Sequence, residues 1–409
     1  MVRGEEGRVG TEATALDTER LERITSHLME QYVQPGEIAG CQVLVARKGR
    51  IAYSRCLGLA DRERGTPVRE NTVWRIYSMT KPITSVALMA LYEQGRFRLT
   101  DPVHRFLPEW GEVRVGVIEG ETIRLVEPER PVTVRDLLTH TSGLSYGMEP
   151  EHPVDRLYAE AGLRDPSMTL EELSRRLASL PLAFQPGTRW RYSLATDVCG
   201  RLVEVLADRP FGEYLQATIF EPLGMVDTGF VVPAGARSRF AASYQRAPEG
   251  GLRLLDDPAT SPYLTARALE SGGGGLVSTV PDYLRFCEML RRGGELDGER
   301  ILGPRTLAFM FRNHLPGGAS LSHVALGAFG ETRFPGVGFG LGLAVLLDPV
   351  EAGCIGSPGE VFWGGAASTL FWVDPLEELV VIFMTQLMPS GTFDFRGQLH
   401  QLVHQAIVG

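Results

Sequence analysis

Hydrophobic and polar positions repeat with two different periods along this chain, and the first part combines a helix with a sheet. Asp17 can cap a helix whose apolar residues lie on one face. Those residues are Leu21, Ile24, Leu28 and Tyr32. Residues 39–47 and 50–58 then alternate with the two-residue period of strands, and Lys48-Gly49 between them predicts a turn. A helix followed by a hairpin predicts an antiparallel sheet with a helix packed on it.

The C-terminal part returns to the pattern of a sheet. Strands are predicted at 339–347, 368–373 and 379–386, with a hairpin turn at 374–378 between the last two. Glycine occupies every second position from residue 336 to residue 342, which we interpret as a strand in close contact with another backbone. A closing helix is predicted from a single apolar face, which consists of Leu399, Leu402, Val403, Ala406 and Ile407.

The middle of the chain contains few alternating runs and predicts a mainly helical lobe. Helices are predicted at about 169–179, 195–208 and 281–292. Residues 145–168 are rich in Pro, Glu and Asp and are expected to form a surface excursion. The fold class is therefore α+β, an antiparallel sheet flanked by N- and C-terminal helices with a helical lobe inserted. We expect a discontinuous sheet domain of residues 1–96 and 251–409 and a helical domain of residues 97–250.

The composition is that of an ordinary globular protein, with 44% hydrophobic and 22% charged residues among 409. A net charge of −9 and the lack of basic runs argue against a nucleic-acid partner. The polar start of the chain, residues 1–6, has no apolar core of a signal, so no membrane partner and a cytoplasmic location are expected. The oligomeric state stays open. Free thiols are expected for Cys41, Cys56, Cys199, Cys287 and Cys354, since none forms a C-x-x-C pair.

One stretch, residues 74–82, carries candidate chemistry. It contains Ser78-Met79-Thr80-Lys81, and the apolar spacing that follows predicts a helix ending at Gly95. Residues three apart share a helix face, so Lys81 is expected beside Ser78. A serine at a helix start also meets free backbone N–H groups, which suits a nucleophile that becomes an acyl ester. The commoner explanation of such a pair is a capping serine with a solvated lysine.

Two other residues near position 140 are weaker candidates. Gly143-Leu144-Ser145-Tyr146-Gly147 matches G-x-S-x-G, but a nucleophile elbow needs a strand before the serine and a helix after it. Here a short helix, opened by a capping box at Thr133 and Asp136, precedes Ser145 and a loop follows it. Ser145 is therefore not predicted to be the nucleophile. His140 lies in a loop, where a histidine is more often a hydrogen-bonded structural residue than a base.

A serine hydroxyl needs a base, and the segment around Tyr192 offers one. Pro186-Gly187 predicts a turn, and Tyr192-Ser193 precedes a helical stretch. A tyrosine held near Lys81 would have its phenolate favoured by the cation. The alternative is a core tyrosine that is hydrogen-bonded through its hydroxyl.

Taken in order, these motifs resemble a known family. The chain resembles the family VIII carboxylesterases of the class C β-lactamase and penicillin-binding-protein superfamily, through the SxxK motif at Ser78 and Lys81, Tyr192-Ser193-Leu194, and Trp363-Gly364-Gly365. The stretches 140–144 and 272–278 are also similar to the family's, and the resemblance runs from about residue 20 to the C-terminus.

The resemblance implies how the residues act. Ser78 is the implied nucleophile, Lys81 and Tyr192 share the proton transfers, and which of the two is the resting base stays open. The backbone N–H groups of Ser78 and Ala366 are the implied oxyanion hole. The implied active site lies at the interface of the two predicted domains.

The third motif implies the substrate class. Lactamases and peptidases of this superfamily carry Lys-Thr-Gly or His-Thr-Gly there, and such a lysine pairs with a substrate carboxylate. Trp363 offers one N–H and a large apolar face, so Trp363, Gly364 and Gly365 are expected to bind a neutral substrate. The other explanation of Trp363 is a core aromatic residue at the sheet edge.

The predicted function is a serine carboxylesterase that cleaves short-chain neutral esters through an acyl-enzyme on Ser78. The alternatives are a β-lactamase or D-amino peptidase, an acyltransferase with an alcohol acceptor, and a catalytically silent binding protein on the same fold. The expected partner is a small-molecule ester. No metal cluster or cofactor fingerprint is visible in the sequence, so neither a metal site nor a cofactor is predicted.

Overall fold

The computed structural model describes residues 14–120, 122–163, 165–247, 250–327 and 335–409. The polar start of the chain, from which no membrane signal was inferred, lies outside these ranges, as do the first residues of the predicted sheet domain. Among the described residues, no helix is long and apolar enough to cross a membrane.

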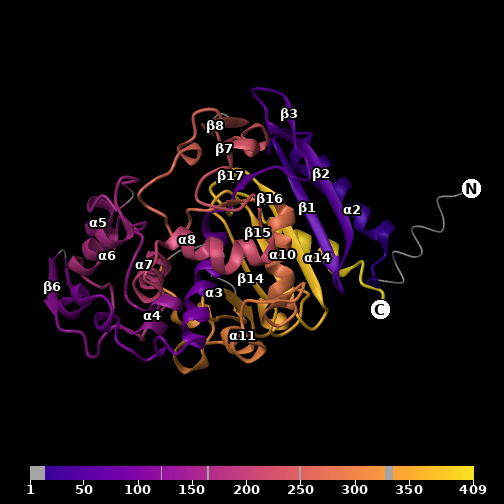
Figure 1. Ribbon diagram of the computed structural model, residues 1–409. Helices are drawn as coiled ribbons and strands as arrows, with labels where there is room; N and C mark the ends of the chain where they lie inside the picture. Colours follow the sequence, from indigo (N-terminus) through magenta and orange to yellow (C-terminus); the bar gives the residue numbers. More distant parts are fainter. Residues whose placement is uncertain (1–13, 121, 164, 248–249, 328–334) are drawn as a thin grey trace, which may run out of the picture.

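A large antiparallel sheet organises the molecule (Figure 1). Its eight strands lie in the order β12-β13-β14-β15-β16-β1-β2-β3. Their bounds are β1 Gly40–Arg47, β2 Arg50–Asp61, β3 Thr66–Pro67, β12 Val337–Phe339, β13 Ala344–Leu346, β14 Val361–Gly364, β15 Leu370–Asp374 and β16 Leu379–Thr385. Strands β1 and β16 are neighbours, with Val43 opposite Phe383, so the two ends of the chain build one sheet. The predicted α+β fold is confirmed.

Two predictions for the C-terminal strands were wrong in detail. The single strand expected at 339–347 is two strands, β12 and β13, because the chain turns where Gly340 N–H donates to the carbonyl of Leu343. Gly342 has φ +94°, and a Cβ there would meet the Ser85 hydroxyl, so its glycine serves a turn and not a strand. Strand β14 was not predicted, because its apolar run ends after a few residues at Gly364 and Gly365.

The sheet is covered on both faces (Figure 1). Helix α10, Val280–Arg291, lies on one face, where Tyr283 contacts Phe371 of β15 with ring centroids 5.1 Å apart. Helix α14, Phe395–His404, and helix α2, Thr18–Leu28, cover the other face. There Trp372 contacts His400 with centroids 4.3 Å apart. Successive residues of a strand point to opposite faces, so these two contacts fix which side chains of β14 and β15 face each layer.

The remaining helices lie in the inserted lobe or in the segments that connect it with the sheet strands and the strands with one another (Figure 1). They are α3 Thr80–Glu93, α4 Val134–Leu138, α5 Pro153–Glu160, α6 Leu170–Ser179, α7 Ala195–Ala207, α8 Phe211–Leu215, α9 Glu221–Leu223, α11 Pro304–Met310, α12 Leu321–Val324 and α13 Pro349–Ala352. The lobe also contains a hairpin that the sequence analysis missed, β5 Val115–Glu119 with β6 Thr122–Val126. The excursion expected at 145–168 contains helix α5.

Among the described residues, three small sheets lie outside the large sheet and the β5–β6 hairpin. Strand β7, Ser243–Arg246, pairs with β8, Leu252–Asp256, and with β17, Leu387–Met388. Strands β4 Trp74–Arg75 and β9 Val277–Ser278 pair, as do β10 Glu295–Leu296 and β11 Glu299–Arg300. One cluster of buried apolar side chains runs through both the sheet and the lobe. The division into two domains at residues 97 and 250 stays a prediction.

Candidate active site

Ser78 lies in a tight turn that leads into helix α3. A 3-10 turn, Tyr77–Met79, follows β4, and α3 begins directly after it, as the sequence predicted. Tyr77 has φ +42°, a conformation that is uncommon for a bulky side chain, so the backbone is strained next to the serine. Ser78 is half-buried in the first turn, where backbone N–H groups lack an intrahelical acceptor.

Lys81 is fully buried beside Ser78. Its amine donates to the Ser78 hydroxyl at 3.1 Å, to the Tyr146 hydroxyl at 2.9 Å and to the Gly273 carbonyl at 2.6 Å. These three acceptors use the full donor capacity of an ammonium group. Burial lowers the pKa of Lys81 to about 7, although the Asp197 carboxylate opposes this shift. At neutral pH a large fraction of the amine is therefore unprotonated and can accept a proton.

The glycine-rich stretch 271–276 brings a carbonyl and a carboxylate close to Lys81. Asp197, in the first turn of α7, accepts hydrogen bonds from the Ser271 hydroxyl at 2.5 Å and the Gly273 N–H at 3.1 Å. A Cβ at residue 272 would lie 2.7 Å from the Thr196 carbonyl, so this backbone approach requires glycine. The sequence analysis predicted the close approach of this stretch but did not single out Asp197.

Tyr146 is the second residue that the sequence analysis missed. It belongs to the G-x-S-x-G match, where the serine drew attention instead. The Ser145 hydroxyl donates to the Asp155 carboxylate at 2.8 Å, and Ser145 is buried away from Lys81, whereas the half-buried Tyr146 places its hydroxyl on the Lys81 amine. No local pattern distinguishes this tyrosine; only its spatial contact does.

Tyr192 lies beside the lysine, as predicted. Its ring centroid is 4.5 Å from the Lys81 amine, and its ring packs 5.1 Å from that of Tyr146. Trp190 stacks on the same tyrosine with centroids 6.1 Å apart. The cation therefore faces an aromatic surface formed by two tyrosines, which stabilises positive charge on the amine.

His140 packs against the rings of Tyr192 and Trp190. It is fully buried, its Nδ1 lies 3.1 Å from the Ser193 hydroxyl, and its ring centroid is 5.1 Å from that of Tyr192. Burial, reinforced by the charge of Lys81, holds the pKa of His140 well below its usual value. It is thus a neutral ring that positions the Tyr192 segment.

The third motif ends strand β14 next to the serine turn. Trp363 is fully buried, with its ring centroid 5.5 Å from that of Tyr192 and 5.4 Å from that of Phe339. A Cβ at Gly365 would collide with the Ile76 carbonyl, so glycine allows β14 to approach the backbone just before Ser78. Ala366 is half-buried in the turn that follows.

These residues form one constellation, in which a serine hydroxyl, an amine that titrates near neutrality and two tyrosines lie in contact. It can activate the serine by removing its proton and can return that proton to a leaving group. Gly364, Gly365 and Ala366 lie beside it. Among the described residues, the side chains that could share a metal ion are Glu360, His400 and His404, which lie elsewhere.

Comparisons with known proteins found relatives along most of this chain. The model of a family described as Beta-lactamase matches residues 25–405. Esterase EstB of Burkholderia gladioli is 36% identical over 397 residues, which cover 93% of this chain and 94% of that protein. Monacolin J acid methylbutanoyltransferase of Aspergillus terreus is 30% identical over 379 residues, covering 87% and 88%. The solved structure of EstCE1, a hydrolase with promiscuous acyltransferase activity, superposes with a TM-score of 0.78 and 31% identity, covering 96% and 99%.

Proposed function

This chain belongs to the Beta-lactamase family, and we propose that it is a carboxylesterase of the family VIII type that cleaves short neutral esters. The observation that carries the proposal is the 3.1 Å contact between the Ser78 hydroxyl and a buried amine whose pKa lies at about 7. The esterase relative supports the same activity.

In the proposed reaction, Ser78 Oγ attacks the ester carbonyl while its proton passes to the network of Lys81 and Tyr192. The backbone N–H groups of Ser78 and Ala366 stabilise the negative oxygen that forms. The bond to the alcohol breaks as the alkoxide takes the proton, which leaves an acyl-enzyme. A water molecule then gives its proton to the same network and attacks the acyl carbon. The bond from that carbon to Ser78 Oγ breaks, Oγ takes the proton back from the network, and the acid is released. Tyr146 holds the amine in place through its hydroxyl.

Trp363 supports the proposed choice of substrate. Because its indole is fully buried against Tyr192, it supports that tyrosine and keeps its surroundings apolar. A lysine at this position would attract a carboxylate; tryptophan does not. Neutral esters are therefore favoured over carboxylate-bearing β-lactams.

A second candidate function is acyl transfer, in which an alcohol replaces water in the second step. It is favoured by the relatives that are an acyltransferase and a hydrolase with acyltransferase activity. The same three catalytic residues serve both reactions, so only the acceptor differs.

Turnover of p-nitrophenyl esters of graded chain length, beside a chromogenic cephalosporin and with or without added alcohol, tests these functions. We expect short esters to be cleaved and the cephalosporin to be a poor substrate. Ser78→Ala should lower ester turnover on the order of 10⁴-fold or more, because the nucleophile is lost. Ser26→Ala, an exposed serine on α2, is the matched control and should leave turnover unchanged.

Labelling with a serine-reactive phosphonate identifies the nucleophile independently. We expect the added mass on the peptide that contains Ser78. Labelling of Ser145 instead would overturn the assignment, and efficient cephalosporin cleavage would overturn the substrate class. A faster release of p-nitrophenol in alcohol, together with a new ester product, would favour the transferase.

A further inference from the structure

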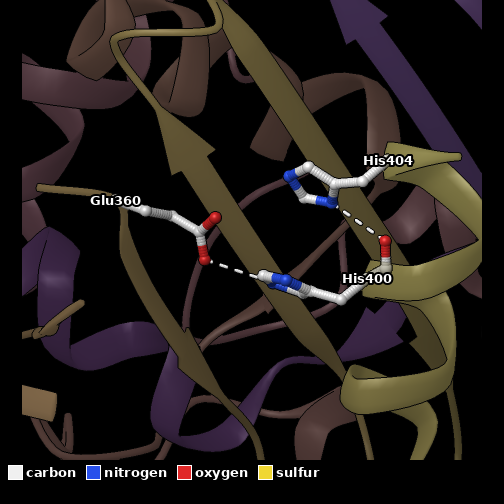
Figure 2. Close-up of side chains that lie close together, drawn as sticks. All are labelled: Glu360, His400 and His404. Carbon is white, nitrogen blue, oxygen red and sulfur yellow. Dashed lines mark hydrogen bonds and ion pairs between the residues drawn. The ribbon is translucent and has the colours of Figure 1, made fainter. Parts of the chain in front are cut away.

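A second buried polar cluster lies on the opposite face of the sheet from Ser78. Figure 2 shows Glu360, directly before β14, reaching toward His400 and His404 of helix α14. Glu360 is 1% exposed, His400 4% and His404 9%, so all three groups are removed from water. The ring of Trp372 packs against that of His400 with centroids 4.3 Å apart. Buried titratable groups require partners, and among the described residues one oxygen of Glu360 and one nitrogen of His404 have none.

The hydrogen bonds of His400 fix which of its ring nitrogens carries no hydrogen. Its Nδ1 lies 2.9 Å from the carbonyl of Ile355. A carbonyl oxygen only accepts, so Nδ1 carries the hydrogen, and in a neutral ring the lone pair is on Nε2. This Nε2 lies 3.1 Å from a carboxylate oxygen of Glu360. The lone pairs of Nε2 and of the carboxylate oxygen then face each other, which is unfavourable unless a proton or a metal ion lies between them.

The same reasoning applies to His404. Its Nδ1 lies 2.9 Å from the carbonyl of His400 and must be the donor, so in a neutral ring its Nε2 also carries no hydrogen. Within the described part of the chain, the Nε2 of His404 and the second carboxylate oxygen of Glu360 have no hydrogen-bond partner. Figure 2 shows the free nitrogen of His404 turned toward the side of Glu360.

We propose that Glu360, His400 and His404 bind a divalent transition-metal ion of the Zn²⁺ class. Two imidazole nitrogens and one carboxylate are a ligand set that suits Zn²⁺. The backbone carbonyls that orient both rings correspond to the outer contacts by which proteins fix metal-binding histidines. The three ligand atoms lie within 4.8 Å of one another. Tetrahedral Zn²⁺ separates its ligand atoms by about 3.3 Å, so a small inward rotation of the rings closes the site.

A cavity gives the ion a route and an open position. Glu360 and His400 line a cavity of about 800 Å³ between α13, α14 and β14, and its lining includes neither Ser78 nor Lys81. A water molecule entering from it can complete the coordination. The ion would tie the C-terminal helix to the strand that ends beside Ala366. This inference is independent of the proposed esterase activity and differs from the sequence analysis, which predicted no metal site.

Metal binding is tested on the full chain after chelator treatment, by calorimetry and thermal unfolding with Zn²⁺ and with Mg²⁺. We expect one Zn²⁺ per chain, a rise in the melting temperature with Zn²⁺, and no rise with Mg²⁺, which prefers oxygen ligands. His404→Gln and Glu360→Gln should each weaken Zn²⁺ binding on the order of a hundredfold or more, since each removes or neutralises a direct ligand. His27→Gln, on the neighbouring helix α2, is the matched control and should bind Zn²⁺ like the wild type.

Co²⁺ gives a readout that does not depend on the stability of any variant. Wild-type protein with Co²⁺ should show the intense visible bands of low-coordinate Co²⁺, and Zn²⁺ should displace them. Absence of Zn²⁺ binding by the wild type overturns the proposal and leaves Glu360 and a protonated His400 as an ion pair. Binding that survives both substitutions, or that depends on the nearby Cys354 instead of His404, also overturns it.

Discussion

Strand β14 separates two buried polar clusters, and the two differ in how their polar groups find partners away from water. Trp363 faces the side of Tyr192 and Lys81, whereas Phe362 faces α14, where the Arg396 guanidinium lies 4.6 Å from its ring centroid. On the first side the Lys81 amine has three acceptors and two aromatic rings around it. On the second side, His400 Nε2 lies 3.1 Å from one Glu360 oxygen, and within the described part of the chain the other Glu360 oxygen and His404 Nε2 have no hydrogen-bond partner.

The difference shows what each cluster needs. A buried cation that is fully hydrogen-bonded is complete without a ligand, and its weakened hold on the proton makes it useful as a base. A cluster of buried acceptors is incomplete and calls for a cation from outside. Substitutions in the first cluster should change ester turnover, whereas Zn²⁺ binding by the second cluster should stay the same.

The largest expected effect comes from removing the members of the proton network. Lys81→Ala and Tyr192→Phe should each lower kcat for a short ester on the order of 10³-fold or more, because each breaks the transfer path. The double variant should be little worse than either single variant. Fully multiplicative losses in steady-state kinetics would show that the two residues act independently. Zn²⁺ binding should be unchanged in all three variants.

A smaller loss is expected for Tyr146→Phe. The Tyr146 hydroxyl accepts a hydrogen bond from the Lys81 amine, and a bond to a charged group contributes about 1.5–3 kcal/mol. We therefore expect kcat/KM to fall roughly ten- to a hundredfold. Tyr158→Phe removes a hydroxyl from another buried tyrosine of the lobe and is the matched control. Equal effects of the two substitutions would assign Tyr146 a packing role only.

Replacing Trp363 tests its role in substrate choice. Trp363→Lys should lower ester turnover and shift the preference toward carboxylate-bearing β-lactams by about ten- to a hundredfold, the value of a charge-assisted hydrogen bond. Trp363→Phe keeps an apolar ring and should retain the ester preference. The ratio of kcat/KM for p-nitrophenyl butyrate and a cephalosporin measures the shift. Unchanged ester kinetics in Trp363→Ala would remove this residue from the site.

The smallest effect concerns pH. Since the pKa of Lys81 is about 7 and the unprotonated amine is the competent base, kcat/KM should rise with pH below 7 and level off above it. The Asp197 carboxylate raises the pKa of Lys81, so Asp197→Asn should move this limb to lower pH. Asp165→Asn, at an exposed carboxylate, is the control. If the rise of kcat/KM moved to higher pH in Asp197→Asn, the inferred effect of Asp197 on the pKa of Lys81 would be wrong.

Local geometry explains which parts of the site were predictable. Ser78 and Lys81 are one turn apart on a helix with clear start and end signals, so their contact followed from the sequence. Tyr192 was found through its motif. Tyr146 and Asp197 were not, because they reach Lys81 from separate segments of the lobe, and no periodic pattern marks the contact.

The sheet shows the same limit. Long strands rich in apolar residues, such as β1 and β16, were predicted within a few residues. The alternating glycines of residues 336–342 suggested one strand, but only Gly338 lies in a strand, whereas Gly340 and Gly342 form the turn between β12 and β13. Strand β14 is too short to give a period at all. His400 and His404 are one helical turn apart in the sequence, but Glu360 joins them only through tertiary packing.

The pairing of β1 with β16 has a consequence for the newborn chain. At about 5–20 residues per second, a ribosome needs roughly 20–70 s after making β1 before β16 is complete. During that time β1 can pair with β2 alone, and its other edge, with Val43 and Val45, waits for a strand that does not yet exist. The sheet therefore closes only after β16 has been made, and protection of that edge by a chaperone would raise the yield of folded enzyme.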